Sequence, residues 1–347
     1  MKNIIRIICI SIAIVSCSKE PVIPPSNYTF GGGVLILNEG NFRGGNGSLS
    51  FYSYDSSKIY NDLFYSVNGR PLGDVPNAIL IKEDKAYIVV NNSGKIEVID
   101  KESLVSKATI NGLISPRNMT IIDNNKAYVS SLYSDSVAII SLANNSISGY
   151  INLRRTSEAI TAVAGNKAYV SNWSGGHEIM VINTINDKVI DSITVGVEPE
   201  SMVRDNTGML WVLCNGGWAR QNFAELDVIN ISTNKVDRKY VFSTIEASPT
   251  CLRIDPLGQT LYYLDNGVRQ MNINAGYLPA APIIPASGAN FYKIAINPVN
   301  SDIFITDAGD YTQPGYVLIY KYIGVFISKV KADIIPGSMF FKLRINN

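Results

Sequence analysis

The fold is decided by one short motif, KAYIV at residues 85–89, which returns as KAYVS at 126–130 and again as KAYVS at 167–171. Each copy begins 41 positions after the one before it. A fixed period of this size is typical of a repeat architecture, and seven units are predicted. Weaker copies of the same apolar and aromatic pattern stand at 33–36, 209–212, 260–263 and 302–305.

Each unit is predicted to hold four strands. The motif is followed by a polar turn and a second β-rich run, usually by a third, and is preceded by one more apolar segment. These segments are rich in β-branched and aromatic residues and are separated by Asn, Asp and Gly, which favours strands and turns. Four strands in about 41–52 residues fit one blade of a β-propeller. A stacked solenoid is the structural alternative, but it would need capping repeats.

The two ends of the repeat region predict how the ring closes. The first unit lacks an innermost strand because the chain enters directly at Gly33, and a spare strand, SMFFKLRI at 338–345, follows the last unit. Pairing the two would remove an exposed sheet edge. The sequence therefore predicts an all-β, seven-bladed β-propeller whose ring is closed by the C-terminal strand pairing with the first blade.

The N-terminal segment has the features of a targeting signal. Lys2 and Arg6 precede an apolar run at 7–15 that is too short to span a bilayer. The run ends in IVSC at 14–17, which resembles a bacterial lipobox, and a Pro-rich stretch follows. We expect a lipoprotein signal peptide at 1–16, lipidated Cys17 with a linker at 17–31, and the propeller at 32–347. A plain signal peptide and an N-terminal membrane helix are the alternatives.

Composition excludes several classes of function. Of the 347 residues, 46% are hydrophobic, and 30 basic residues balance 29 acidic ones, so a nucleic-acid partner is not expected. One His and four Cys leave little material for His-based catalysis or a Cys/His zinc site. The prediction is a non-enzymatic protein with no catalytic residue, resident cofactor or metal. Cys214 and Cys251 can form a disulfide or stand as buried free thiols.

One face of the propeller is predicted to bind a ligand. It combines the loops between the second and third strands with the loops that lead into each innermost strand. These loops are rich in aromatic and amide side chains, which suit a large amphipathic ligand such as cobalamin or an oligosaccharide. The alternative is that the polar residues only shape tight turns and the aromatic ones cap the core. The candidate ligand-binding residues are Asn41, Phe42, Asp74, Asn92, Arg117, Tyr133, Trp173, Trp218, Asn266, Tyr292, Asp310 and Tyr311.

Two minor chemical hypotheses concern His177 and a calcium site. His177 stands in a Gly-rich turn, where it is either an exposed turn residue or a lone base or cobalt ligand. The second hypothesis is an axial Ca²⁺ held by carboxylates from several blades. The carboxylates considered for it are Glu39, Asp74, Asp265, Asp307 and Asp310.

Several stretches resemble a known family. The KAYVS pattern resembles the YVTN-type propeller repeats of bacterial surface proteins. LNEGNF at 37–42, NGRPLGDV at 68–75, DAGDY at 307–311 and IPG at 335–337 resemble surface-layer-type lipoprotein propellers of Bacteroides-like bacteria. Some members of that group, the BtuG type, capture cobalamin at the outer-membrane surface and pass it to a TonB-dependent transporter.

The resemblance implies a function and a location. It implies a lipid-anchored outer-membrane protein, exposed at the cell surface, that captures cobalamin for a TonB-dependent receptor and is otherwise monomeric. An adhesion or interaction scaffold that binds glycan or protein is one alternative. A Ca²⁺-dependent propeller hydrolase or lyase is another.

Overall fold

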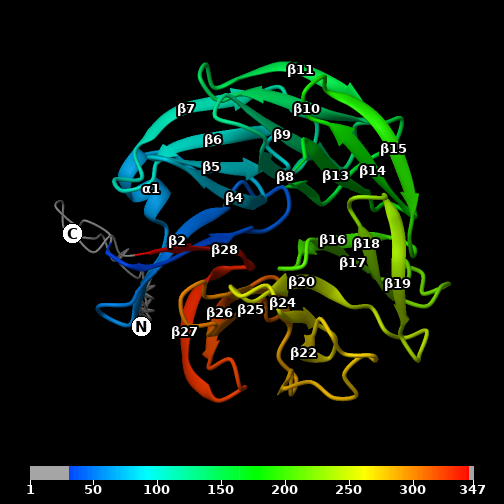
Figure 1. The fold of residues 1–347 in the computed structure, drawn as a ribbon. Helices are drawn as coiled ribbons and strands as arrows, with labels where there is room; N and C mark the ends of the chain where they lie inside the picture. The colour runs from blue at the N-terminus through cyan, green and yellow to red at the C-terminus, as the bar shows by residue number, and fades with distance from the viewer. Residues whose placement is uncertain (1–30, 164, 344–347) are drawn as a thin grey trace, which may run out of the picture.

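A computed structural model describes residues 31–163 and 165–343, which form seven four-stranded antiparallel sheets around one axis (Figure 1). The predicted all-β, seven-bladed β-propeller is therefore confirmed. The predicted signal peptide, Cys17 and the linker up to residue 30 lie outside the described residues. In each blade, the first strand named below lies nearest the axis and the last lies on the outside.

Blade 1 contains β28 (Pro336–Lys342), β1 (Gly33–Asn38), β2 (Ser48–Ser53) and β3 (Lys58–Tyr60). Blade 2 contains β4 (Pro76–Lys82), β5 (Lys85–Val90), β6 (Lys95–Asp100) and β7 (Ser106–Asn111). Blade 3 contains β8 (Pro116–Ile121), β9 (Lys126–Ser131), β10 (Ser136–Ser141) and β11 (Ser146–Asn152). Blade 4 contains β12 (Ile160–Val163), β13 (Lys167–Asn172), β14 (Glu178–Asn183) and β15 (Lys188–Thr194).

Blade 5 contains β16 (Pro199–Arg204), β17 (Met209–Cys214), β18 (Glu225–Asn230) and β19 (Lys235–Val241). Blade 6 contains β20 (Thr250–Ile254), β21 (Thr260–Leu264), β22 (Gly267–Asn272) and the two-residue β23 (Ile284–Pro285). Blade 7 contains β24 (Phe291–Ile296), β25 (Ile303–Asp307), β26 (Pro314–Tyr320) and β27 (Phe326–Ile334).

The ring is closed by the strand that the sequence predicted. β28 pairs antiparallel with β1, and the register sets Val34 opposite Phe341 and Leu35 opposite Phe340. β28 also contacts β24 and β4, the innermost strands on either side of it (Figure 1). The strand lies two to three residues earlier than predicted, at Pro336–Lys342 instead of 338–345.

The KAY motif holds neighbouring blades together. Its tyrosines are fully buried. Tyr87 and Tyr128 each pack in one core cluster with the motif alanine of the next blade, as Tyr128 does with Ala168. Tyr169 packs instead with Leu210, which stands at that position in blade 5. The motif lysine and tyrosine also reach a turn of the next blade. Lys167 Nζ and Tyr169 Oη both donate hydrogen bonds to Asn234 Oδ1, over 2.9 and 2.8 Å. The copies at 126–128 and 167–169 are therefore inter-blade clamps.

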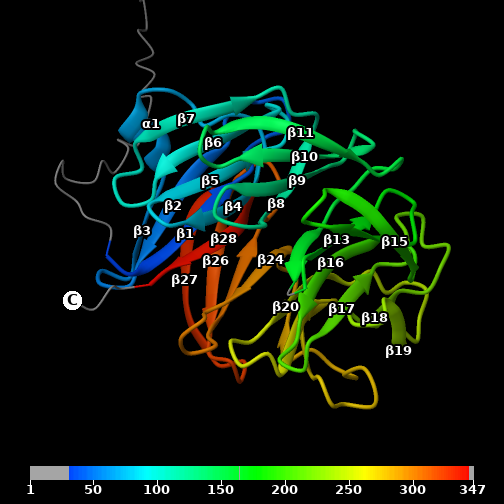
Figure 2. The same ribbon diagram turned by 45° about the horizontal axis from the view of Figure 1, so that its top comes forward.

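One short helix departs from the predicted all-strand pattern. α1 (Leu63–Asn68) lies in the loop between β3 and β4, on the outside of the ring beside β7 (Figure 2). Leu63 and Phe64 are buried, and Gly69 ends the helix in a left-handed conformation, with its N–H bonded to the carbonyl of Tyr65. Six residues are too few to give a recognisable helical period, so the sequence pattern does not reveal this helix.

Two further features settle points that the sequence left open. Cys214 and Cys251 are both free and buried. Trp211 is fully buried, and its indole donates to Asp205 Oδ2 over 2.8 Å. Within residues 31–163 and 165–343, no helix has the length and apolar character needed to cross a membrane.

Deleting residues 336–347 should destabilise the whole ring, because it exposes the edge of β1 and the core beneath Phe340 and Phe341. We expect loss of the cooperative melting transition, or a fall in Tm of more than about 10 °C, measured by differential scanning calorimetry. Deleting only residues 344–347 is the matched control and should leave Tm unchanged. An unaltered Tm after the longer deletion would contradict closure by β28.

Candidate functional site

The entry into each innermost strand is shaped by a repeated backbone feature. Val75, Ser115, Glu198 and Ile335 have positive φ values between 40° and 58°, and each stands directly before the proline that begins its strand. Such conformations are strained in residues other than glycine and concentrate at functional sites. Their carbonyls accept hydrogen bonds from the neighbouring loop of the same blade, as in Asn91 N to Val75 O at 2.8 Å.

A β-bulge follows this entry in six of the seven blades. A bulge redirects the side chain of the extra residue. In six blades one residue occupies the second position of the innermost strand, and in blade 4 the residue one 41-residue repeat after Arg117, Glu158, lies just before β12. We call this set of seven the axial collar. The axial collar consists of Asn77, Arg117, Glu158, Glu200, Cys251, Tyr292 and Gly337.

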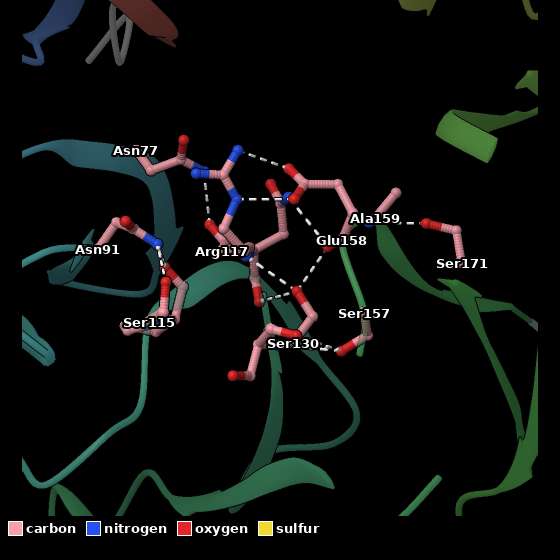
Figure 3. Close-up of polar contacts among 12 residues, drawn as sticks. Asn77, Asn91, Ser115, Arg117, Ser130, Ser157, Glu158, Ala159 and Ser171 are labelled. Atoms are coloured by element: carbon pink, nitrogen blue, oxygen red, sulfur yellow. Dashed lines mark hydrogen bonds and ion pairs between the residues drawn. The ribbon is translucent and has the colours of Figure 1, made fainter. Parts of the chain in front are cut away.

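Arg117 and Glu158 form an ion pair within the axial collar (Figure 3). Arg117 Nε and Nη2 donate to the two carboxylate oxygens of Glu158 over 2.7 and 2.9 Å. Burial acts to lower the pKa of Arg117, but the charge and hydrogen bonds of Glu158 outweigh it and raise that pKa. The predicted site residue Arg117 is therefore a fixed cation, held by two parallel bonds.

Neighbouring innermost strands are also joined by neutral hydrogen bonds. Asn77 Nδ2 donates to the carbonyl of Arg117 over 2.7 Å, and Asn118 Nδ2 to that of Glu158 over 3.1 Å (Figure 3). Ser338 Oγ donates to the carbonyl of Asn77 over 2.6 Å, which links β28 to β4. These bonds fix the axial side chains relative to one another.

Glu39 takes the place of the side chain that Gly337 lacks. A Cβ on Gly337 would come within 3.2 Å of Glu39 Oε1, so this glycine gives the carboxylate its room. Tyr292 Oη lies 2.9 Å from both carboxylate oxygens and donates to them. Burial raises the pKa of Glu39, and Lys293 and Tyr292 oppose that rise only in part. Burial and the Glu39 charge raise the pKa of Tyr292 as well.

A polar cavity of about 140 Å³ lies on the axis and is lined by residues of all seven innermost strands or their entries. Lys293 and Arg253 enter it from β24 and β20. Neither has a carboxylate within 4.0 Å among the residues that the structure describes. Two acidic residues line the cavity: Glu158, which is paired with Arg117, and Glu200, which accepts a hydrogen bond from the Cys251 backbone N–H over 2.8 Å.

Aromatic side chains stand around the end of the axis at which the innermost strands begin, which we call the channel mouth. They stand on the loops between second and third strands, which antiparallel alternation puts on the same face as the strand entries. We call these residues the aromatic rim. Trp218 is 91% exposed and Tyr133 is 76% exposed. The aromatic rim consists of Phe42, Tyr133, Trp173, Trp218 and Tyr311, from blades 1, 3, 4, 5 and 7. Trp173 differs from the other four because it is half-buried, and its indole Nε1 is buried without a hydrogen-bond partner in the described part of the chain.

The structure joins some of the remaining predicted site residues in pairs. Asn41 Nδ2 donates to the Tyr311 carbonyl over 3.2 Å, which connects blades 1 and 7. Asn92 Nδ2 donates to Asp74 Oδ2 over 2.5 Å. The other carboxylate oxygen of Asp74 is buried and has no hydrogen-bond partner in the described part of the chain.

The last two predicted site residues do not join these pairs. Asp310 is exposed, and the N–H groups of Thr312 and Gln313 lower its pKa. Asn266 is exposed in a left-handed turn and lines a separate hollow of about 430 Å³ between blades 5 and 6.

Further lining residues were missed by the sequence prediction. A hollow of about 480 Å³ between blades 4 and 5 is lined by Phe223 and Ile245, together with His177, which the sequence had singled out. Phe223 lies in the same loop as Trp218. Lys293 and Arg253 were also missed, because they stand in runs that read as ordinary strands; their position just after a strand entry is the signal that could have found them.

The carboxylates considered for calcium do not converge. Across residues 31–163 and 165–343, no group of three or more His, Cys, Asp or Glu side chains is placed to hold a metal ion. Asp307 Oδ1 accepts hydrogen bonds from the N–H groups of Asn290 and Gly309. Asp265 pairs with Arg269 over 3.2 Å. Both carboxylates therefore have partners within the protein.

Comparison with protein families finds one match over most of the chain. A family model described as "Domain of unknown function (DUF5074)" matches residues 32–328. No curated protein sequence matches the chain.

Solved structures share the propeller fold at low identity. One is a quinonprotein alcohol dehydrogenase-like protein from Bacteroides thetaiotaomicron, with TM-score 0.71 and 15% identity over 91% of this chain and 79% of that one. A second is a candidate 6-phosphogluconolactonase from Bacteroides fragilis, with TM-score 0.68 and 13% identity over 90% and 98%. A third is virginiamycin B lyase from Staphylococcus aureus, with TM-score 0.57 and 14% identity over 70% and 80%. These neighbours differ in chemistry, so the likeness extends to the fold alone.

Replacing Arg117 with Ala should destabilise the protein by about 3 kcal/mol, because it leaves the Glu158 carboxylate with little exposure and without its bidentate partner. Urea unfolding measures the loss. The double variant Arg117→Ala/Glu158→Ala removes both charges and should lose less than Arg117→Ala alone. Equal losses in the two would show that the pair contributes no coupling.

Glu39→Gln should change the pH dependence of stability. A folded pKa raised above the ordinary 4.5 means that the folded state holds the proton more tightly. The Glu39 carboxyl therefore contributes its full stabilisation at pH values below its unfolded pKa. This contribution is lost as the pH rises through the folded pKa. Gln does not titrate, so the free energy of unfolding of Glu39→Gln relative to wild type should rise from acidic pH to neutrality.

Urea unfolding at several pH values tests this expectation for Glu39. Glu83→Gln, at a carboxylate exposed in a turn, is the control and should show a flat difference. A flat difference for Glu39→Gln as well would contradict the burial of its charge.

Proposed function

This chain belongs to the DUF5074 family, and we propose that it is a lipid-anchored surface protein of the outer membrane that captures a large amphipathic organic ligand. Cobalamin is the leading candidate ligand. The observation that carries the proposal is the aromatic rim around a polar channel mouth. We further propose that the protein is not an enzyme and delivers its ligand to a TonB-dependent receptor.

The aromatic rim and the axial collar offer two kinds of contact at one place. Exposed rings such as Trp218 and Tyr133 supply flat apolar area at a small entropic cost. The mouth between them supplies fixed polar groups, among them the Arg117–Glu158 pair and the Glu39–Tyr292 pair. A flat macrocycle with many amide side chains, as in cobalamin, matches both kinds of contact.

The point at which the chain enters the propeller supports a surface role. Gly33 is paired with Lys342, at the end of blade 1 that is opposite the loop of Phe42. A linker from a lipidated Cys17 would thus reach the propeller on the face away from the aromatic rim. The rim would then point away from the membrane, where it is accessible to a ligand and to a receptor.

Calorimetric titration of cyanocobalamin into the mature chain, residues 18–347, tests the ligand. We expect one-to-one binding, and Trp218→Ala or Trp173→Ala should weaken it at least about tenfold, or about 1.4 kcal/mol, with the fold intact. The matched control is Tyr150→Ala, because Tyr150 is also exposed but lies on β11, on the outer side of blade 3.

The two possible failures have different meanings. Binding that both tryptophan variants retain would show that the aromatic rim is not the binding face. An absence of binding at micromolar cobalamin would remove that ligand, and oligosaccharides would be titrated next against the same variants.

A further inference from the structure

Apolar side chains gather on the face opposite the aromatic rim, at the turns of blades 6 and 7. Leu257 and Val299 stand on the turns between first and second strands and are 68% and 74% exposed. The hairpin tip between β26 and β27 adds Tyr322, Ile323 and Val325, each more than half exposed. We call these five residues the apolar turns.

The fold does not require apolar residues at these positions. The turns of blades 2 and 3 that correspond to those of Leu257 and Val299 read KEDK at 82–85 and DNNK at 123–126. Turn geometry favours polar residues, and water favours them as well. Among the described residues, blade 4 has a single exposed apolar residue, Ile185, on a turn of this face, whereas blades 6 and 7 bring five together. This cluster on two adjacent blades indicates a contact with an apolar partner.

The hairpin tip is held in place. Gly324 N donates to the Lys321 carbonyl and Lys321 N to that of Val325, both over 2.8 Å. Gly324 has φ +84° and lies against blade 6, where a Cβ would come within 2.7 Å of the Ile283 carbonyl oxygen. Gln270 Nε2 donates to the Tyr322 carbonyl over 3.4 Å. The apolar side chains are thus presented on a fixed frame, which reduces the entropy lost on binding.

An apolar cavity opens beside the apolar turns, between blades 7 and 1. Its volume is about 580 Å³, and Val299 and Ile327 line it. Tyr52, Tyr54 and Phe304 contribute aromatic rings that meet edge to face, with centroids 6.0 to 6.5 Å apart. A hydrocarbon chain fits such a space, because the lining is mostly apolar and its polar groups are paired, as in Asn297 Nδ2 to Tyr54 Oη at 3.2 Å.

We propose that the apolar turns rest on a lipid bilayer, with the neighbouring cavity receiving an acyl chain. The chain enters the propeller at the wall of this cavity, since Tyr54 N donates to the Gly32 carbonyl over 3.1 Å. Cys17 precedes Gly32 by 15 residues, which span at most about 54 Å. A lipid on Cys17, which is part of the proposed function, would hold this face near the bilayer.

The shape of the apolar turns favours lipid over protein. Leu257, Val299 and Ile323 protrude from three separate turns. A fluid acyl layer deforms around each tip, whereas a protein partner would need a matching hollow for each. Apolar side chains inserted at the boundary of headgroups and acyl chains also bind without a specific receptor.

Vesicle co-sedimentation tests the proposal with the unlipidated mature chain, residues 18–347. The vesicles contain phosphatidylethanolamine and phosphatidylglycerol. We expect the wild type to bind, and Ile323→Asp/Val325→Asp to lower the vesicle-bound to free ratio about tenfold or more. Ile185→Asp is the matched control, because Ile185 is 72% exposed on the corresponding turn of blade 4, and it should bind as the wild type does.

Three outcomes would overturn the membrane contact. They are no vesicle binding by the wild type, an equal loss in Ile185→Asp, or a wild-type dimer in ultracentrifugation that Ile323→Asp/Val325→Asp dissociates. The last would assign the face to a second copy of this chain. Melting curves check that the variants fold. Calorimetric titration of cyanocobalamin without vesicles is read separately, so loss of vesicle binding and loss of ligand binding are distinguishable.

Discussion

The pairing of β28 with β1 is the constraint on which the rest of the structure depends. It joins the two ends of the chain in one sheet, with Gly33 opposite Lys342. Only a closed ring puts seven innermost strands around one axis, and only then can a side chain of one strand bond the backbone of the next. Ser338 on β28 makes such a bond to the Asn77 carbonyl on β4. The polar cavity and the axial collar are therefore products of closure, and no single blade contains them.

Contacts between successive repeats hold neighbouring blades together. A four-stranded blade cannot bury both of its faces alone. Two of the KAY motifs solve this by packing a large tyrosine with the small motif alanine of the next blade, as Tyr128 does with Ala168. The lysine and tyrosine then bond a turn of the next blade, as Lys167 and Tyr169 do with Asn234. The 41-residue period is the distance along the chain between successive clamps.

The sequence predicted the fold because that period is local and repeated, whereas much of the site is neither. Arg117 could be predicted because it follows a Ser-Pro turn, but its partner Glu158 comes from the next blade. Glu39 approaches Tyr292 because Gly337, nearly 300 positions later, lacks a side chain. No local pattern encodes that approach. Lys293 was missed for a related reason: it follows two aromatic residues in a strand, and only the bulge at its entry brings it to the axial cavity.

Antiparallel strands separate the two surfaces that carry the proposals. Successive turns of a blade alternate between the two faces, so the aromatic rim and the apolar turns stand at opposite ends of the strands. Phe42 on the rim and Gly33 at the chain entry are separated by the length of β1 (Gly33–Asn38), which is about 20 Å. Residues this far apart, with no shared contacts, contribute to stability and binding almost independently. The ligand-binding face and the membrane face that we propose are therefore compatible, because neither surface is built from the residues of the other.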